Sequence, residues 1–167
     1  DTCAFSALSW AKVLLLQVAI VAVPSGVLVL DTDVVILQDV SKWIQRRAES
    51  LDPGRSALWV GLNPDWEDAS TNANTGVLFA TGSAAPVIER WLVQRQRWQT
   101  EFHNIASSGL ADIGFYSDVE GLMRVLKTAS GTFDLVRIPR DVVEMCNPKR
   151  VPDGVYAVHY TCTSIAS

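Results

Sequence analysis

Two aspartates with one residue between them follow an unbroken apolar stretch in this chain. Val27–Leu30 contains no polar residue, which predicts a strand buried on both faces, and Asp31-Thr32-Asp33 comes directly after it. Ionised carboxylates at the end of a buried strand require a counter-charge, hydrogen bonds or a metal. Side chains two residues apart in an extended chain point the same way, so Asp31 and Asp33 can share one Mg²⁺ or Mn²⁺. The alternative is an acidic turn that caps the segment after it.

A histidine occupies a comparable position near the other end of the chain. His159 follows the apolar run Val155–Val158 and therefore ends a predicted strand. A neutral imidazole can complete a metal shell of carboxylate and phosphate oxygens, which makes His159 the candidate third metal ligand. The alternative is a structural histidine with a local hydrogen bond. The other histidine, His103, is expected at the surface, in a loop after the predicted helix that contains Trp98.

Three further sites each have a functional and a structural interpretation. In Asn74-Thr75-Gly76 the glycine permits a ligand to approach the backbone closely, although Asn and Gly also form turns that lead into strands. Asp118 is either a carboxylate that faces a ligand or a helix N-cap or first-turn acid. Lys12 either reaches a phosphate or is a solvated lysine on a helix.

Most of the tryptophans fall where a core is predicted. Four of the six lie in predicted helices and strands and are expected to be buried. They are Trp43, Trp59, Trp91 and Trp98. Trp66 differs, because it lies between two acids in the polar segment Asn63–Asn74. It either stacks on a sugar face or anchors the loop.

Composition limits the class of protein. At 167 residues, with 49% apolar and 19% charged residues, the chain is expected to be one globular domain. A net charge of −4 and dispersed basic residues argue against a nucleic-acid-binding surface. Cys3, Cys146 and Cys162 show no metal-binding spacing. One disulfide with a spare thiol and three free thiols are both compatible with this spacing.

The apolar segment Val13–Val23 is too short to span a membrane. It has 11 residues, contains Gln17 and is followed by Pro24-Ser25-Gly26, whereas a spanning helix needs about 20 apolar residues. It also lacks the features of a cleaved signal peptide. We therefore expect a helix of the protein core here.

The remaining pattern alternates strands with helices. We expect helices from residue 6 or 9 to about 23, from 39 or 41 to about 47, from 83 past 98, and over 116–128. Strands are expected over 27–31, 57–62, 75–80, 133–138 and 155–159. Such alternation predicts an α/β sandwich around a largely parallel sheet.

The order of these features resembles the nucleotide-diphospho-sugar transferase domain of plant and algal glycosyltransferases, the GT-A fold group of glycosyltransferase family 77. The resemblance is carried by a helix with Lys12, a strand into Asp31-Thr32-Asp33, then Asn74-Thr75-Gly76, a helix led by Asp118, and a late His159-Tyr160. It implies a Rossmann-like GT-A sandwich with a mostly parallel central sheet flanked by helices. It also implies a further strand upstream of residue 1, so that residues 1–167 form a single, partial domain.

The resemblance assigns roles by position. It implies that Asp31 and Asp33 hold a divalent metal, Mn²⁺ or Mg²⁺, on the donor diphosphate, and that His159 completes the metal site. Asn74 and Gly76 match the segment beside the sugar and the acceptor. Lys12 is grouped with the donor-binding residues.

The helix led by Asp118 departs from the family pattern. Asp118 falls where the family usually has Asp-Gln, but Val119 replaces the glutamine. The resemblance implies that the Asp118 carboxylate faces the donor sugar or the acceptor hydroxyl. Asp118 is the one placed candidate for a catalytic nucleophile, and a front-face and a covalent reaction both remain open. The resemblance further implies a Golgi-lumen, type II membrane enzyme whose membrane segment lies outside this chain.

The predicted function is metal-dependent transfer of a sugar to a hydroxyl. The donor is a nucleotide-diphosphate sugar, a UDP-sugar by resemblance, and the acceptor is a glycan or glycoprotein, with retention of configuration implied by the family. One alternative is a non-catalytic binding or structural domain of the same fold. A more distant one is a metal-dependent phosphatase with Asp31 as nucleophile and Asp33 as general acid. For that chemistry Lys127 is a weak lysine candidate, and no later Asp-Asp pair follows.

Overall fold

The computed structural model describes residues 2–49, 57–62, 73–107, 117–128, 133–139, 142–145, 151 and 153–160. The helices are α1 (Thr2–Ala22), α2 (Ser41–Ala48), the 3-10 turn η1 (Gly82–Ala84), α4 (Ala85–Ser107) and α5 (Asp118–Thr128). The strands are β1 (Val27–Leu30), β2 (Val34–Ile36), β3 (Ala57–Leu62), β4 (Ala73–Ala80), β5 (Asp134–Ile138), β6 (Val143–Met145) and β7 (Ala157–His159).

The strands form two small mixed sheets. Sheet A has the order β1-β4-β3-β5, and sheet B has the order β2-β7-β6. The α/β class is confirmed, but the predicted mostly parallel sheet is wrong. Among the described strands only the pairs β3–β5 and β6–β7 are parallel. Strand β4 runs antiparallel to both of its neighbours, and β2 runs antiparallel to β7. A buried apolar strand has the same composition whether it pairs parallel or antiparallel with its neighbours. The sequence pattern therefore did not distinguish a parallel from an antiparallel sheet.

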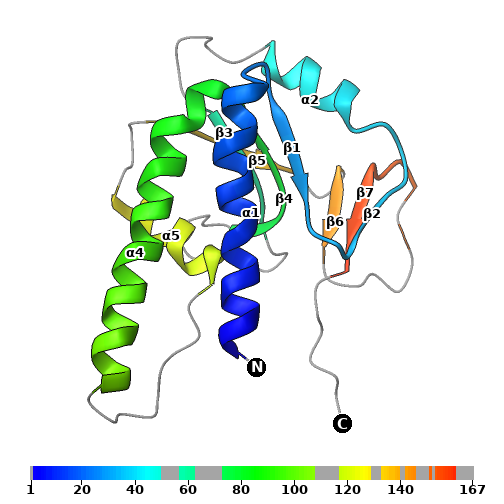
Figure 1. Cartoon of the computed structure of the whole chain (residues 1–167). Coiled ribbons are helices and arrows are strands. Elements are labelled where there is room, and N and C mark those ends of the chain that lie inside the picture. Colours follow the sequence, from blue (N-terminus) through cyan, green and yellow to red (C-terminus); the bar gives the residue numbers. More distant parts are fainter. Residues whose placement is uncertain are drawn as a thin grey trace, which may run out of the picture.

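Sheet A separates two apolar layers (Figure 1). On one face, α1, α4 and α5 pack together over the sheet, and on the other face lie α2 and sheet B. Neighbouring residues of β3 serve opposite layers: Leu58 and Val60 face the helices, and Trp59 faces sheet B. All three are fully buried. Burial on both faces was predicted for Val27–Leu30, but the four residues of β1 are only half-buried, because β1 is an edge strand of sheet A.

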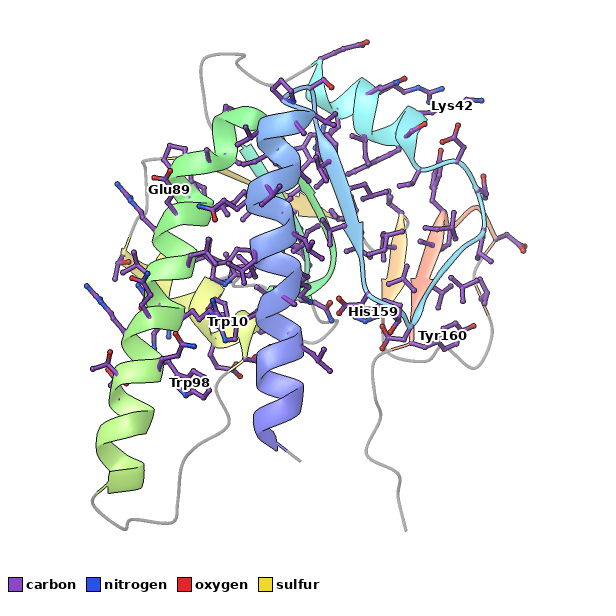
Figure 2. The ribbon with its side chains drawn as sticks, in the orientation of Figure 1. Trp10, Lys42, Glu89, Trp98, His159 and Tyr160 are labelled. Carbon is purple, nitrogen blue, oxygen red and sulfur yellow. The ribbon has the colours of Figure 1, made fainter. Side chains whose placement is uncertain are left out.

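Helix α1 is a core helix on one face only. Trp10, Val13, Leu16 and Ile20 are buried at helical spacing, and Figure 2 shows Trp10 pointing from α1 toward α4. Several apolar side chains of the opposite face are exposed, among them Leu15. In the described part of the chain, no helix has both the length and the hydropathy that crossing a bilayer requires.

Some boundaries differ from the sequence-based expectation. Helix α4 continues to Ser107, so His103 lies in a helix and the predicted loop there is wrong. Strand β4 begins at Ala73, two residues before the predicted start, while residues 63–72, with Trp66, lie outside the described residues. Strands β2 and β6 were not predicted, because three residues are too few to display a period.

The start of α5 is fixed by a capping box. Ser117 precedes the helix, and both its backbone N–H and its hydroxyl donate to the carboxylate of Glu120. This is the part of the Ser-x-x-Glu capping box in which the glutamate side chain satisfies the N-cap amide. Further on, Gly121 lies so close to Trp10 and Trp91 that an added Cβ would overlap Trp10. The cap and the glycine contact set where α5 begins and how near it lies to α1 and α4.

We predict that Ser117→Ala lowers the free energy of unfolding by about 1 kcal/mol, since loss of an N-cap side chain typically costs about 0.5–2 kcal/mol. Urea denaturation followed by circular dichroism measures it. Thr100→Ala is the control, because this exposed hydroxyl only bonds back to the Gln96 carbonyl within α4. Its effect should stay within about 0.5 kcal/mol. If both substitutions lower the free energy of unfolding equally, Ser117 has no stabilising role as the N-cap of α5.

Candidate metal centre and its charged surroundings

The two aspartates lie in the turn that carries the chain from sheet A to sheet B. The Val34 N–H donates to the Asp31 carbonyl at 3.1 Å and closes the turn. On the sheet A side, the Asp31 N–H donates to the Gly76 carbonyl at 2.8 Å. On the sheet B side, the Tyr160 N–H donates to the Asp33 carbonyl at 3.0 Å. The backbone therefore holds each aspartate against a different sheet.

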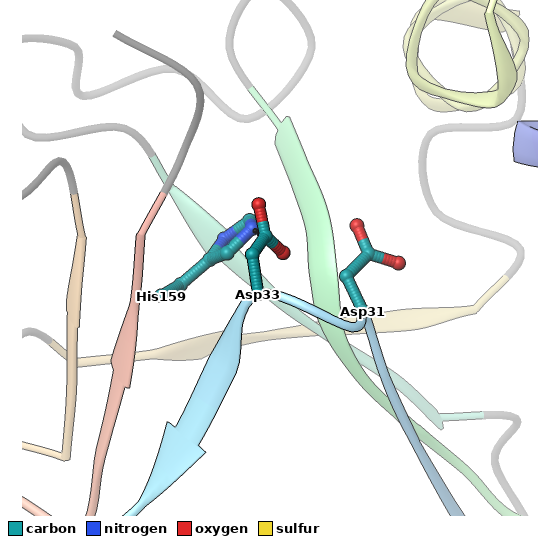
Figure 3. Close-up of side chains that lie close together, drawn as sticks. All are labelled: Asp31, Asp33 and His159. Carbon is teal, nitrogen blue, oxygen red and sulfur yellow. Dashed lines mark ion pairs between the residues drawn. The ribbon is translucent and has the colours of Figure 1, made fainter. Parts of the chain in front are cut away.

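His159 completes a cluster with the two aspartates (Figure 3). It ends β7, and its side chain is 6% exposed, with Nε2 3.1 Å from Asp33 Oδ1. One ligand atom from each of Asp31, Asp33 and His159 can be chosen so that all three lie within 4.8 Å of one another. His159 Nδ1 is buried and has no hydrogen-bond partner among the described residues. A buried ring nitrogen without a partner is unusual in a folded protein and is compatible with a role in binding an ion.

The donor set suits a hard or borderline divalent ion. Two carboxylates and one imidazole are ligands that Mg²⁺, Mn²⁺ and related ions accept. Opposite ligands of a six-coordinate Mg²⁺ lie about 4.2 Å apart, twice the ion–oxygen distance of about 2.1 Å. The three side chains therefore need only small rotations to bind such an ion. The structure does not identify the metal.

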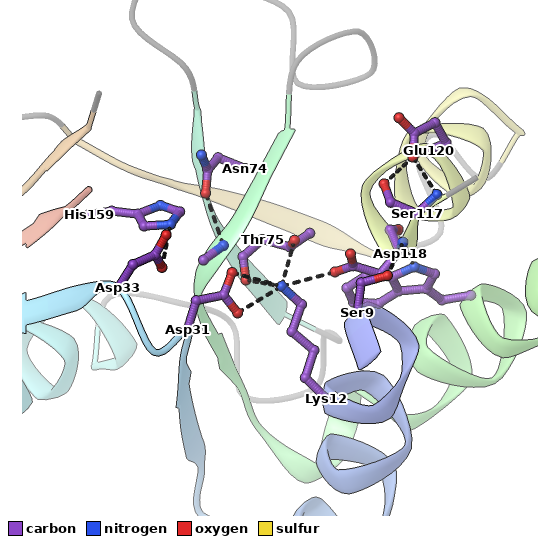
Figure 4. A network of polar contacts seen from close by, with 12 residues as sticks. Ser9, Lys12, Asp31, Asp33, Asn74, Thr75, Ser117, Asp118, Glu120 and His159 are labelled. Carbon is purple, nitrogen blue, oxygen red and sulfur yellow. Dashed lines mark hydrogen bonds and ion pairs between the residues drawn. The ribbon is translucent and has the colours of Figure 1, made fainter. Parts of the chain in front are cut away.

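Lys12 joins the metal cluster to a third acid, Asp118, which is buried (Figure 4). Its Nζ donates to both carboxylate oxygens of Asp31, at 2.9 and 3.1 Å, and to the hydroxyl and carbonyl oxygens of Thr75, at 2.9 and 3.1 Å. It also forms an ion pair with Asp118 Oδ2 at 3.1 Å. The Lys12 side chain is only 15% exposed. The interpretation of Lys12 as a solvated lysine is therefore wrong.

Asp118 is the most deeply buried acid among the described residues. It is the first residue of α5, so it is a first-turn acid, and Ser117 takes the N-cap position. Its carbonyl accepts a 2.7 Å hydrogen bond from the indole N–H of Trp91. Burial raises the pKa of the Asp118 carboxyl above its ordinary value, although the neighbouring Lys12 acts in the opposite direction.

Asn74 and Gly76 are positioned by each other. The Asn74 side-chain oxygen accepts a 2.9 Å hydrogen bond from the Gly76 N–H, and both residues are buried within β4. The space beside the Gly76 α-carbon, predicted to admit a sugar, is taken up by the imidazole of His159. Gly76 therefore lies at the edge of the metal cluster.

The predicted site residues thus form one group rather than separate features. Lys12, Asp31, Asp33, Asn74, Gly76, Asp118 and His159 are joined directly or through one neighbour. Two further contacts of the site were not predicted: Thr75 as a partner of Lys12, and the Ser117–Glu120 cap, whose Ser-x-x-Glu motif is present in the sequence. Trp59 and Trp91 are fully buried, and Trp43 and Trp98 pack partly buried against the two layers, as predicted. Cys146 and Cys162 lie outside the described residues.

Comparison with known proteins shows the fold. No family model and no curated protein matches the sequence. The structure is similar to that of mouse xyloside xylosyltransferase 1 in its apo form, with a TM-score of 0.55 and 11% sequence identity. The match covers 93% of this chain and 64% of that chain. This chain thus spans less than two thirds of the mouse enzyme, and the likeness shows a GT-A-like fold.

We predict that metal-free wild-type protein loses stability relative to Asp118→Asn as the pH rises from about 3.5 to 7. A raised pKa means that the folded state binds the Asp118 proton more tightly than the unfolded state. The Asp118 contribution to stability is therefore greatest below the unfolded pKa, and it falls as the pH rises through the folded pKa. Urea denaturation in EDTA at several pH values measures the difference. If the free energy of unfolding of the wild type instead rises relative to that of Asp118→Asn over this pH range, burial does not raise the pKa of Asp118.

Proposed function

We propose that this chain is a glycosyltransferase domain that uses a divalent metal to transfer a sugar from a nucleotide-diphosphate donor to a hydroxyl acceptor. The observation that carries the proposal is the group of Asp31, Asp33 and His159 at the carboxyl end of β1. The likeness in fold to a xylosyltransferase supports it. A bound Mg²⁺ or Mn²⁺ would neutralise the negative charge that develops on the leaving diphosphate.

The chain's own residues would prepare the site for that charge. Asp31, Asp33 and His159 would hold the ion, and each aspartate already has a polar partner, Lys12 for Asp31 and His159 for Asp33. Lys12 would place a second positive charge beside the donor phosphates. The Lys12 ammonium is paired with two carboxylates, and Asp33 adds a third carboxylate beside His159, so the acids outnumber the lysine and favour a divalent cation.

Asp118 would act on the sugar side of the site. Its carboxyl contacts Lys12 and is held at the start of a capped helix, so its position is fixed before a substrate arrives. We propose that it faces the donor sugar or the acceptor hydroxyl, and that Asn74 lies beside the same sugar. The raised pKa of Asp118 lets it take up or share a proton at a higher pH than an exposed aspartate would.

The finer assignment follows the sequence resemblance. We propose membership of glycosyltransferase family 77, a UDP-sugar donor, a glycan or glycoprotein acceptor, and transfer with retention of configuration. By the same resemblance, the complete protein would be a type II membrane enzyme of the Golgi lumen, with its membrane segment outside this chain.

A non-catalytic domain of the same fold is the second candidate. The observation that favours it is Val119, a half-buried apolar residue where the family usually has glutamine. A valine offers no hydrogen bond to a sugar hydroxyl, so donor binding would have to depend on the remaining polar residues. Binding measurements separate the two candidates.

We predict that the protein binds a UDP-sugar in the presence of Mn²⁺ and much more weakly in EDTA, because the ion would bridge the carboxylates and the diphosphate. Isothermal titration calorimetry with UDP-xylose, UDP-galactose and UDP-arabinose measures this. Metal-independent binding would contradict the proposed site. Absence of binding by a chain that does bind Mn²⁺ would support the non-catalytic domain.

We predict that Asp31→Asn and Asp33→Asn each reduce Mn²⁺-dependent transfer about 100-fold or more. Loss of a ligand charge should exceed the roughly 10–100-fold effect of losing an outer-shell partner. Asp39→Asn is the matched control, because Asp39 is an exposed acid near the same turn that bonds only to Ser41 among the described residues. Radiolabelled sugar transfer measures the rates. Full activity in either site variant, with the control unchanged, would eliminate the proposed metal role.

A further inference from the structure

Both backbone polar groups of Gly76 are hydrogen-bonded, and one of these bonds is to Asp31 of the metal cluster. Its carbonyl accepts the 2.8 Å hydrogen bond from the Asp31 N–H, so it holds the first aspartate. Its own N–H is fixed by the Asn74 side chain at 2.9 Å. Both backbone polar groups of this one residue are therefore satisfied, and the peptide units around it have a defined orientation.

The space where a side chain of residue 76 would lie is occupied by the imidazole of His159. A Cβ built at position 76 would overlap Cε1, Nδ1 and Nε2 of the imidazole. The ring therefore lies directly against the backbone of β4, in space that any other residue would fill with its own side chain. The overlap involves a buried ring that is 6% exposed and contacts Asp33, so a new methyl group could be accommodated only by moving that ring.

The local course of β4 explains why the approach is possible. Val60 pairs with Leu78, but the next residue of β3, Gly61, pairs with Asn74. Residues 75–77 of β4 thus have no Cα partner in β3, which is the kind of irregularity that redirects a strand beside a functional site. Thr75, inside the irregular segment, turns its carbonyl toward Lys12. Gly76, next to it, is left free of a side chain on the His159 side.

We propose that Gly76 is the positioning residue of the metal centre, because it sets the distance between Asp31 in sheet A and His159 in sheet B. It contributes no ligand atom. A side chain at this position would displace the imidazole from Asp33 and open the three-ligand cluster. This inference rests on the metal centre of the proposed function, but it requires neither a nucleotide sugar nor transfer activity.

The test is a double-mutant cycle on the full chain with Mn²⁺ alone as the probe. Gly76→Ala, His159→Ala and the combined variant are compared with wild type by calorimetry and by the electron paramagnetic resonance signal of free Mn²⁺. Gly76→Ala should weaken Mn²⁺ binding roughly ten- to hundred-fold. In the His159→Ala background the same substitution should have little further effect, because the ring that the methyl group displaces is absent.

Thermal unfolding supplies a readout without metal. Gly76→Ala should lower the melting temperature in EDTA, and most of that loss should disappear when His159 is also alanine. If Gly76→Ala alone does not fold, recovery of folding in the double variant supports the proposal. Failure of the double variant to fold as well overturns it, because the overlap would then not be with His159.

Gly121→Ala is the matched control. It also places a methyl group against a buried aromatic ring, that of Trp10, but in the helix layer of the molecule. It should lower the melting temperature and leave Mn²⁺ affinity unchanged within about two-fold at a temperature where the protein is folded. An equal loss of affinity in Gly121→Ala and Gly76→Ala would show a general effect of instability and overturn the proposal.

Two remaining outcomes are separable. If folded Gly76→Ala binds Mn²⁺ as tightly as wild type, the positioning role is wrong and the proposed function is untouched. If wild type itself binds no Mn²⁺, the metal centre is wrong, and both the positioning role and the metal-dependent transferase are overturned together.

Discussion

The ammonium group of Lys12 is the contact on which the arrangement of the site depends. Lys12 belongs to α1, and its ammonium group contacts Asp31 after β1, Thr75 in β4 and Asp118 at the start of α5. Because the lysine side chain is only 15% exposed, water screens these charges poorly. Removal of the ammonium would leave two neighbouring carboxylates with no cation between them, which is far more costly than loss of an exposed ion pair. One charge therefore ties together four elements that are distant in the sequence.

The apolar layers explain how that charge reaches its partners. Trp10 and Val13 face the core from α1, and Lys12, lying between them in the sequence, emerges at the margin of the same face. The depth of α5 is set separately, by the close approach of Gly121 to Trp10 and Trp91, while the Ser117–Glu120 cap fixes the residue at which the helix starts. Packing and capping thus bring Asp118 within reach of Lys12, and the ion pair with the ammonium then holds the Asp118 carboxyl in place. The apolar faces bring the polar side chains together, and the Lys12 ammonium fixes their arrangement.

The parts of this structure that the sequence predicted are the local ones. The strand before Asp31 was recognisable because its four consecutive apolar residues pack, partly buried, against both apolar layers. The helix over residues 118–128 was recognisable because its apolar residues recur at helical spacing. The direction of β4 was not predictable, since pairing direction depends on connections rather than on composition. Nor was the Gly76–His159 contact, which joins residues in different sheets. A lysine on an apolar helix is usually solvated, and only the fold places Lys12 beside two acids.

A metal ion bound by this group would link the two sheets. Asp31 is held by its backbone to β4 in sheet A, whereas Asp33 is held to Tyr160 and His159 at the end of β7. Before any ion binds, each carboxylate already has a partner on its own side, so the repulsion between them is partly relieved and little rearrangement is needed. An ion that binds all three side chains only in the folded state adds its binding free energy to the stability of the junction, about 2.7 kcal/mol at one hundred times the dissociation constant. Because the ligands belong to different sheets, that free energy resists their separation, and the centre that would hold a diphosphate would also hold the two halves of its own binding surface together.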